Sequence, residues 1–160
     1  MNVSCVTKGV DETRALAATI AELARPGDVL VLTGELGAGK TAFAQGFAAG
    51  LGVTEQVTSP TFTIARPYQG RLTMNHLDVY RLDYLQEAVD LGLSELVDDG
   101  AVTLVEWGEV VLPALPGDRL DVLLLHGDED DLRTLQLHPV GRTWASRADA
   151  LAGALFRWSA

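Results

Sequence analysis

The feature that most constrains this chain is a glycine-rich segment between an apolar run and a helical pattern. Residues 28–33 (DVLVLT) form an apolar run bounded by turn residues, which is typical of a strand buried in a parallel sheet. Residues 40–51 have the pattern of a helix that ends near Gly50 and Gly52. The connecting segment, Gly34–Thr41, reads GELGAGKT and fits the spacing G-x-x-x-x-G-K-[ST]. We therefore predict a phosphate-binding loop between a strand and a helix.

The chemistry of phosphate binding explains this pattern. Several backbone N–H groups must meet a polyphosphate at once, and glycines allow the close wrapping and positive φ angles that this needs. The helix that begins near Lys40 points its partial positive charge at the phosphates. The Lys40 ammonium is expected to reach the β- and γ-phosphates, and the Thr41 hydroxyl to bind Mg²⁺.

Strand and helix patterns alternate along the rest of the chain, which predicts an α/β fold. The expected class is P-loop NTPase-like and three-layered, with a mostly parallel central sheet and antiparallel hairpin additions. Asp11 is expected to cap the first helix. Strands are predicted over residues 2–7, 28–33 and 101–106, hairpins over 57–78 and 119–138, and helices over 11–25, 40–51, 84–93 and 143–158.

Length and composition favour one folded domain. The chain has 160 residues, of which 48% are hydrophobic. Residues 1–142 are predicted to form the P-loop domain, and residues 143–160 a helical extension packed on it. Leu151, Leu155 and Trp158 would form the packed face of that extension.

Charge and cysteine usage narrow the function classes further. The formal net charge of −10 argues against nucleic-acid binding by this chain alone, because Lys and Arg are the residues that neutralise backbone phosphates. The single cysteine, Cys5, excludes an internal disulfide and is expected in the core. No apolar run has the roughly 18 residues of a membrane span, and no signal-peptide pattern is present. We expect a cytoplasmic protein with no membrane partner.

Nucleotide hydrolysis also needs an acidic group for Mg²⁺, and two candidates end predicted strands. Asp78 follows the run 72–77, and Glu106 follows the run 102–105. Either carboxylate could bind Mg²⁺ directly or through water. His76 lies on the same strand face as Asp78, but the histidines and the cysteine lack zinc-ligand spacing, which favours a packed histidine over a metal ligand.

The nucleotide and the class of reaction can be argued from what the sequence lacks. It contains neither an Asp-x-x-Gly nor an Asn-Lys-x-Asp motif, so ATP is favoured over GTP. A small-molecule kinase is the alternative, because Arg66, Arg71 and Arg81 could hold a transferring phosphate. A binding module that senses ATP and hydrolyses it only within a complex is a third class.

Four segments in order then give a more specific interpretation. They are GELGAGKT (34–41), TSPTF (58–62), HLDVYRLD (76–83) and EWGE (106–109). Together they resemble the bacterial TsaE (also called YjeE) family of P-loop ATPases over roughly residues 4–142. That resemblance implies a mainly parallel sheet with helices on its faces. It also implies hydrolysis of ATP to ADP and phosphate, with Mg²⁺ as cofactor, in threonylcarbamoyladenosine modification of tRNA next to the anticodon.

The resemblance also implies partners and roles. The partners would be TsaB and TsaD, and the chain would meet tRNA only through their complex. ATP hydrolysis would reset that complex, and ATP hydrolysis by the chain alone would be weak. Ala42 and Gly108 depart from the family, which usually has Thr and Pro there. The metal-binding residues would be Thr41, Glu106 and Asp78. The catalytic residues would be Glu106, Asp78, Thr61 and Trp107, and Ser59 and Pro60 would belong to a switch-like loop. The nucleotide-binding residues would be Glu35, Leu36, Gly37, Ala38, Gly39, Lys40, Thr41, Ala42, Thr13 and Arg133.

Overall fold

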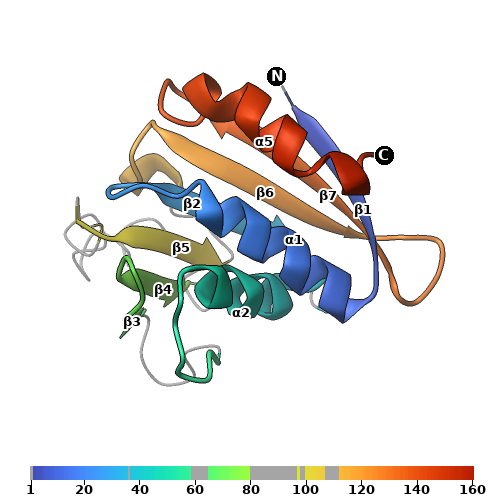
Figure 1. Cartoon of the computed structure of the whole chain (residues 1–160), viewed down its shortest axis with the longest axis horizontal. Helices are drawn as coiled ribbons and strands as arrows, with labels where there is room; N and C mark the ends of the chain where they lie inside the picture. The colour runs from blue at the N-terminus through green and yellow to red at the C-terminus, as the bar shows by residue number, and fades with distance from the viewer. Residues whose placement is uncertain (1, 36, 59–64, 80–96, 98–99, 107–111) are drawn as a thin grey trace.

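The computed structural model describes residues 2–35, 37–58, 65–79, 97, 100–106 and 112–160. In this part of the chain, seven strands form one sheet (Figure 1). The strands are β1 (Val3–Lys8), β2 (Val29–Gly34), β3 (Ala65–Tyr68), β4 (Met74–Asp78), β5 (Val102–Glu106), β6 (Arg119–His126) and β7 (Leu132–Val140). The described α-helices are α1 (Val10–Glu22), α2 (Lys40–Gly50) and α5 (Ala148–Ala154), and the 3-10 helices are η1 (Leu112–Ala114), η2 (Ala145–Arg147) and η3 (Phe156–Trp158).

The centre of the sheet is parallel and its edges are antiparallel. The strand order is β1-β7-β6-β2-β5-β4-β3, and the four strands β6, β2, β5 and β4 run parallel to one another. β7 and β1 add antiparallel pairs at one edge, and β3 adds one at the other. This confirms the prediction of a parallel centre with hairpin additions, since β3–β4 and β6–β7 are the two expected hairpins.

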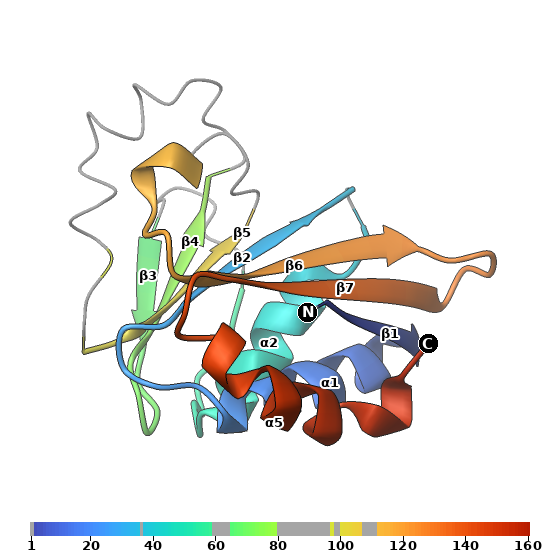
Figure 2. The same cartoon turned by 90° about the horizontal axis from the view of Figure 1, so that it is seen from above.

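Hydrophobic side chains pack on both faces of the sheet. Figure 2 shows α1, α2 and α5 on one face, where the larger core lies. On the other face, Val31, Leu77 and Val105 pack with Leu115, just after η1. The helix predicted over residues 84–93 lies outside the described residues, so the prediction of a three-layered, P-loop NTPase-like arrangement stays a prediction.

Two glycines let α2 lie very close to α1. A Cβ atom at Gly46 would stand 2.2 Å from the carbonyl oxygen of Arg14, and one at Gly50 would stand 2.5 Å from that of Ala18. Because these glycines are four residues apart, they lie on one side of α2. The close approach fixes the direction of α2, and with it the position of the loop that precedes the helix.

The last eighteen residues pack on the same core. Trp144, Leu151 and Leu155 are fully buried and Trp158 is nearly so, in one cluster with residues of α1 and β1. This confirms the packed face predicted for Leu151, Leu155 and Trp158. The boundary assigned between residues 142 and 143 stays a prediction.

Two predicted helix features were wrong. The last helix is not continuous over residues 143–158: only Ala148–Ala154 is α-helical, with 3-10 turns before and after it. There, the buried contacts of Trp144 and Arg147 override the helical tendency of the segment. The first helix begins at Val10, one residue early, so Asp11 lies in its first turn and Gly9 occupies the N-cap position without a side-chain hydrogen bond.

Candidate nucleotide-binding site

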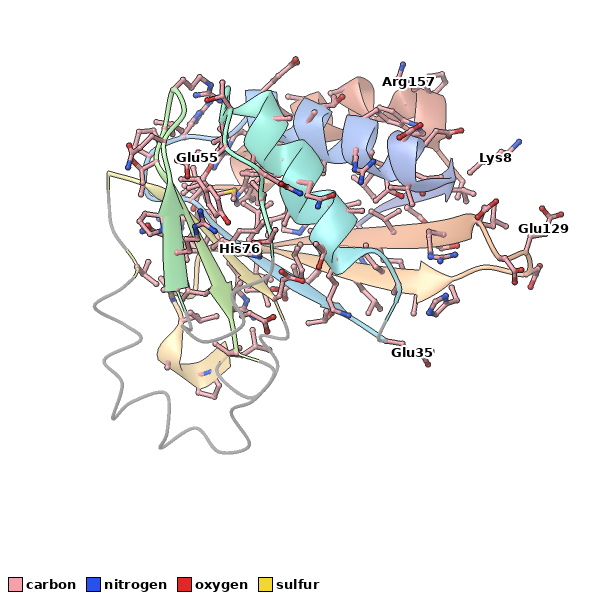
Figure 3. All side chains as sticks on the ribbon, turned by 90° about the horizontal axis from the view of Figure 1, so that it is seen from below. Lys8, Glu35, Glu55, His76, Glu129 and Arg157 are labelled. Atoms are coloured by element: carbon pink, nitrogen blue, oxygen red, sulfur yellow. The ribbon has the colours of Figure 1, made fainter. Side chains whose placement is uncertain are left out.

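The glycine-rich loop leaves the carboxyl end of β2 and enters α2, as the sequence predicts. Gly34 has a φ of 145°, and a Cβ atom there would stand 2.3 Å from the carbonyl oxygen of Leu124 on β6. Gly37 and Gly39 also have positive φ angles. These backbone conformations favour glycine, so the local shape of the loop explains the spacing of its glycines. Leu36 lies outside the described residues, and Figure 3 shows Glu35 pointing away from the sheet at the tip of β2.

Lys40 curls back over the loop that precedes it. Its Nζ donates to the carbonyl oxygens of Gly34 at 2.6 Å and Glu35 at 2.9 Å. Its side chain is only 5% exposed, which is unusual for a lysine. The ammonium is therefore held inside the curve of the loop, which places a positive charge there.

The two predicted carboxylates lie side by side at the edge of the sheet from which the loop emerges. Asp78 and Glu106 end the parallel strands β4 and β5, and they are register partners. On its other side, Glu106 is the register partner of Leu32 in β2. Glu106 is buried, at 2% exposure, and Asp78 is half-buried. The fold thus places Glu106 beside the strand that carries the loop, and Asp78 one strand further out.

His76 forms a contact that sequence reasoning missed. The ring is fully buried, as predicted for a packed histidine, and its Nε2 lies 2.5 Å from Oε2 of Glu106. The spacing of two between His76 and Asp78 indicated a shared strand face. It gave no sign that His76 would reach Glu106, because that contact depends on the pairing of β4 with β5.

Thr13 and Arg133, predicted beside the nucleotide, both line a small hollow next to the loop. Its volume is about 70 Å³, and Gly37, Gly39 and Ala42 also line it. Arg133 donates from Nη2 to the Gly37 carbonyl oxygen at 3.4 Å, and the Thr13 hydroxyl hydrogen-bonds to the hydroxyl of Thr7 at 2.7 Å. The geometry brings these residues to the loop, and their contact with a nucleotide stays a prediction.

Two of the three arginines of the kinase alternative, Arg71 and Arg66, make contacts within the chain. Arg71 donates from Nη2 to the carbonyl oxygens of Ala21 and Ala24, at 2.7 and 3.2 Å, where α1 ends. Arg66 pairs with Glu55 at 3.6 Å. Arg81 lies outside the described residues, as do Ser59, Pro60, Thr61 and Trp107, so the roles predicted for them stay predictions.

The donor set suits Mg²⁺ bound with a nucleotide better than a metal held by protein alone. Across residues 2–35, 37–58, 65–79, 97, 100–106 and 112–160, no cluster of three or more His, Cys, Asp or Glu side chains could hold a metal. Mg²⁺ typically uses one or two carboxylates together with phosphates and waters. Asp78, Glu106 and the Thr41 hydroxyl offer oxygen donors of that kind.

No described helix has the length and apolar composition of a membrane span.

Comparisons with known proteins identify relatives of this chain. The sequence profile of the family described as "Threonylcarbamoyl adenosine biosynthesis protein TsaE" matches residues 7–135. A Bacillus subtilis relative named tRNA threonylcarbamoyladenosine biosynthesis protein TsaE is 43% identical over 147 residues, covering 91% of each chain. A Treponema pallidum relative of the same name is 46% identical over 112 residues, covering 70% of this chain and 83% of the relative.

A solved structure extends the likeness to three dimensions. The crystal structure of Bacillus subtilis YdiB aligns with a TM-score of 0.77 and 39% sequence identity, covering 98% of this chain and 95% of that one. The match therefore includes residues after position 135, where the family profile ends. Profile, relatives and structure point to one conclusion: this chain belongs to the TsaE family.

Proposed function

We propose that this chain is an ATP-binding and ATP-hydrolysing subunit that acts in threonylcarbamoyladenosine modification of tRNA. The family profile and the names of the relatives support the role in that modification. The observation that carries the ATPase part is the juxtaposition of the loop, with Lys40 held inside it, and the Asp78–Glu106 pair on the neighbouring strands.

The chain's own residues divide the work of phosphate chemistry. Backbone N–H groups of the loop and the N-terminus of α2 bind the phosphates, and Lys40 turns from the loop carbonyls toward the β- and γ-phosphates. Thr41 and Glu106 would hold Mg²⁺, with Asp78 nearby in a supporting or catalytic role. The metal ion supplies charge neutralisation on the phosphate oxygens.

Hydrolysis itself requires an oriented water and a stabilised leaving group. A water oxygen bonds to the γ-phosphorus, the bond to the bridging oxygen breaks, ADP leaves, and the water proton passes to the released phosphate. Arg71 donates to backbone carbonyl oxygens where α1 ends, so it is not available for this role. We propose that a partner protein completes the site, as an arginine finger does in other P-loop proteins. Turnover by the isolated chain should therefore be slow, and TsaB and TsaD are the partners we propose.

The test is ATP hydrolysis by the purified chain, alone and with TsaB and TsaD. We expect weak hydrolysis that rises with the partners and is lost in Lys40→Ala and Glu106→Ala. Lys8→Ala and Glu22→Gln are the matched controls, because both residues are exposed and Figure 3 shows Lys8 pointing away from the sheet. Phosphate transfer to a small metabolite, or rapid turnover that ignores the partners, would contradict the proposal.

A further inference from the structure

The Glu106 carboxylate is buried at 2% exposure and has a partner that the proposed mechanism does not yet use. That partner is His76, whose Nε2 lies 2.5 Å from the carboxylate oxygen Oε2. We propose that His76 is a positioning residue, which fixes the Glu106 carboxylate in the orientation that Mg²⁺–nucleotide binding and hydrolysis require. This inference rests on the proposed function, and it adds a residue that touches neither nucleotide nor metal.

The direction of the hydrogen bond follows from the chemistry of the two groups. A carboxylate that holds Mg²⁺ is ionised and can only accept, so in that state Nε2 would carry the proton and donate to Oε2. A hydrogen bond to an ionised group is stronger than one between neutral groups, and burial strengthens it further. The bond occupies Oε2 and restricts rotation of the carboxylate, which leaves Oε1 as the oxygen available to a second partner.

The Nδ1 atom of His76 indicates that the Nε2 contact with Glu106 is what favours a histidine at this position. In the described part of the chain, Nδ1 of His76 is buried without a hydrogen-bond partner. A buried polar atom left unpaired destabilises a fold, and an apolar side chain of similar size would avoid that cost. A histidine at this position therefore gains its advantage through the other nitrogen, at Glu106.

The neighbours of the ring hold it in place from the side of β3. The Tyr68 ring lies against His76, with 6.5 Å between centroids and 43° between planes. The Tyr68 hydroxyl in turn lies 3.4 Å from both the backbone N and the carbonyl oxygen of Thr58. Figure 3 shows His76 within the sheet, away from the tip of the loop marked by Glu35. Packing thus restricts the ring, and the ring restricts the carboxylate.

Direct metal binding through Nε2 of His76 does not fit this geometry. Its Nε2 is already engaged by Glu106, and no described cluster of three or more potential ligands includes it. Outer partners that orient a metal-binding group typically change metal affinity or activity by about 10- to 100-fold when they are removed. That range sets the size of effect expected for His76.

The experiment compares His76→Ala, His76→Gln and His76→Asn in the full chain. The Gln side-chain amide nitrogen can take the place of Nε2, whereas the Asn nitrogen is one carbon short of it. His138→Ala is the matched control, because His138 is exposed on β7 and belongs to no part of the site. Three quantities are measured: ADP affinity without Mg²⁺, the Mg²⁺ concentration that half-saturates ADP binding, and kcat with TsaB and TsaD.

We expect His76→Ala to keep Mg²⁺-free ADP affinity within about 2-fold, because Lys40 and the loop remain. Its half-saturating Mg²⁺ concentration should rise, and its kcat fall, by about 10- to 100-fold. His76→Gln should recover both to within a few-fold, and His76→Asn should not. If His76→Ala does not fold, the Gln and Asn variants decide the question by the same two quantities.

Two results would overturn the inference while leaving the proposed function intact. One is a His76→Ala variant that matches the His138→Ala control in both Mg²⁺ dependence and kcat. The other is equal behaviour of the Gln and Asn variants. Failure of the proposed function looks different: Lys40→Ala and Glu106→Ala would then hydrolyse ATP like the unmodified chain, and the Mg²⁺ dependence of ADP binding would still decide the role of His76.

Discussion

At the scale of single residues, Gly34 is the position where the loop has the least freedom. Its φ of 145° is strained for any residue with a side chain, and a Cβ atom would stand 2.3 Å from a carbonyl oxygen of the neighbouring strand. We expect Gly34→Ala to lower the free energy of unfolding by about 2 to 5 kcal/mol, from backbone strain and overpacking together. The measurement is urea unfolding followed by circular dichroism.

A matched glycine makes this prediction specific. Gly153 lies in α5, and no heavy atom lies within 4 Å of a Cβ atom built there. Gly153→Ala should therefore be neutral or stabilising by about 1 kcal/mol, since alanine favours helix. Equal stability of Gly34→Ala and Gly153→Ala would show that the loop can move away from β6 and that Gly34 does not restrict it.

Cys5 is a second residue whose environment can be tested, through pH. Burial raises the pKa of its thiol from 9.0 to about 11, so the thiol is neutral at physiological pH. Because the folded-state pKa is the higher one, the stability that Cys5 contributes is complete below about pH 9 and is lost as the pH rises toward 11. Relative to Cys5→Ala, the chain should lose about 2 to 3 kcal/mol across that interval. Parallel stability curves of the two proteins over this range would contradict the assignment.

At the scale of elements, a buried ion pair joins the C-terminal extension to the strand that carries the loop. Arg147 donates from Nη1 and Nη2 to the two carboxylate oxygens of Asp28, each at 2.7 Å, and also to the carbonyl oxygen of Leu23. Asp28 immediately precedes β2, so this pair anchors the start of the strand that leads to the loop. The extension is thus part of the support of the site.

Removing one partner of such a pair leaves a buried charge without compensation. We expect Arg147→Met to cost about 3 to 5 kcal/mol of unfolding free energy, and Arg147→Met with Asp28→Asn to recover part of the loss. Arg157→Met is the control, because Arg157 is exposed and Figure 3 shows it at the surface. Its guanidinium lies 3.8 Å from the centre of the Trp158 ring, so its effect should stay within about 1 kcal/mol. If Arg147→Met unfolds at the same urea concentration as Arg157→Met, the extension does not support β2.

Elements with a local cause could be predicted from the sequence, and elements with a tertiary cause could not. The run before Gly34 and the glycines of the loop have local causes, so strand, loop and helix were predicted to within about two residues. The break before α5 arises where Arg147 reaches Asp28, a contact across 119 residues. The His76–Glu106 contact likewise depends on which strands are neighbours, and no local pattern encodes that order.

At the scale of the whole molecule, the arrangement of the sheet concentrates chemistry at one edge while the net charge limits what the surface can bind. The carboxyl ends of β2, β4 and β5 meet at that edge because the three strands are parallel neighbours. The sequence placed Asp78 and Glu106 at strand ends, but only the strand order makes them register partners beside the loop. Their shared role in Mg²⁺ binding comes from the family resemblance and stays a prediction.

The charge of the whole chain leads to the last prediction, on tRNA. With 22 acidic and 12 basic residues the chain carries a formal net charge of −10, so it should repel a phosphate backbone. Non-specific nucleic-acid binding by basic surfaces typically has a Kd of about 10⁻⁴ to 10⁻⁶ M at physiological salt. We expect the isolated chain to show no saturable binding of fluorescent tRNA below about 10⁻⁴ M, and binding to appear only when TsaB and TsaD are added. The measurement is fluorescence anisotropy at two salt concentrations. If the chain alone binds tRNA with a micromolar Kd that weakens with added salt, a local basic surface overrides the net charge and the prediction is wrong.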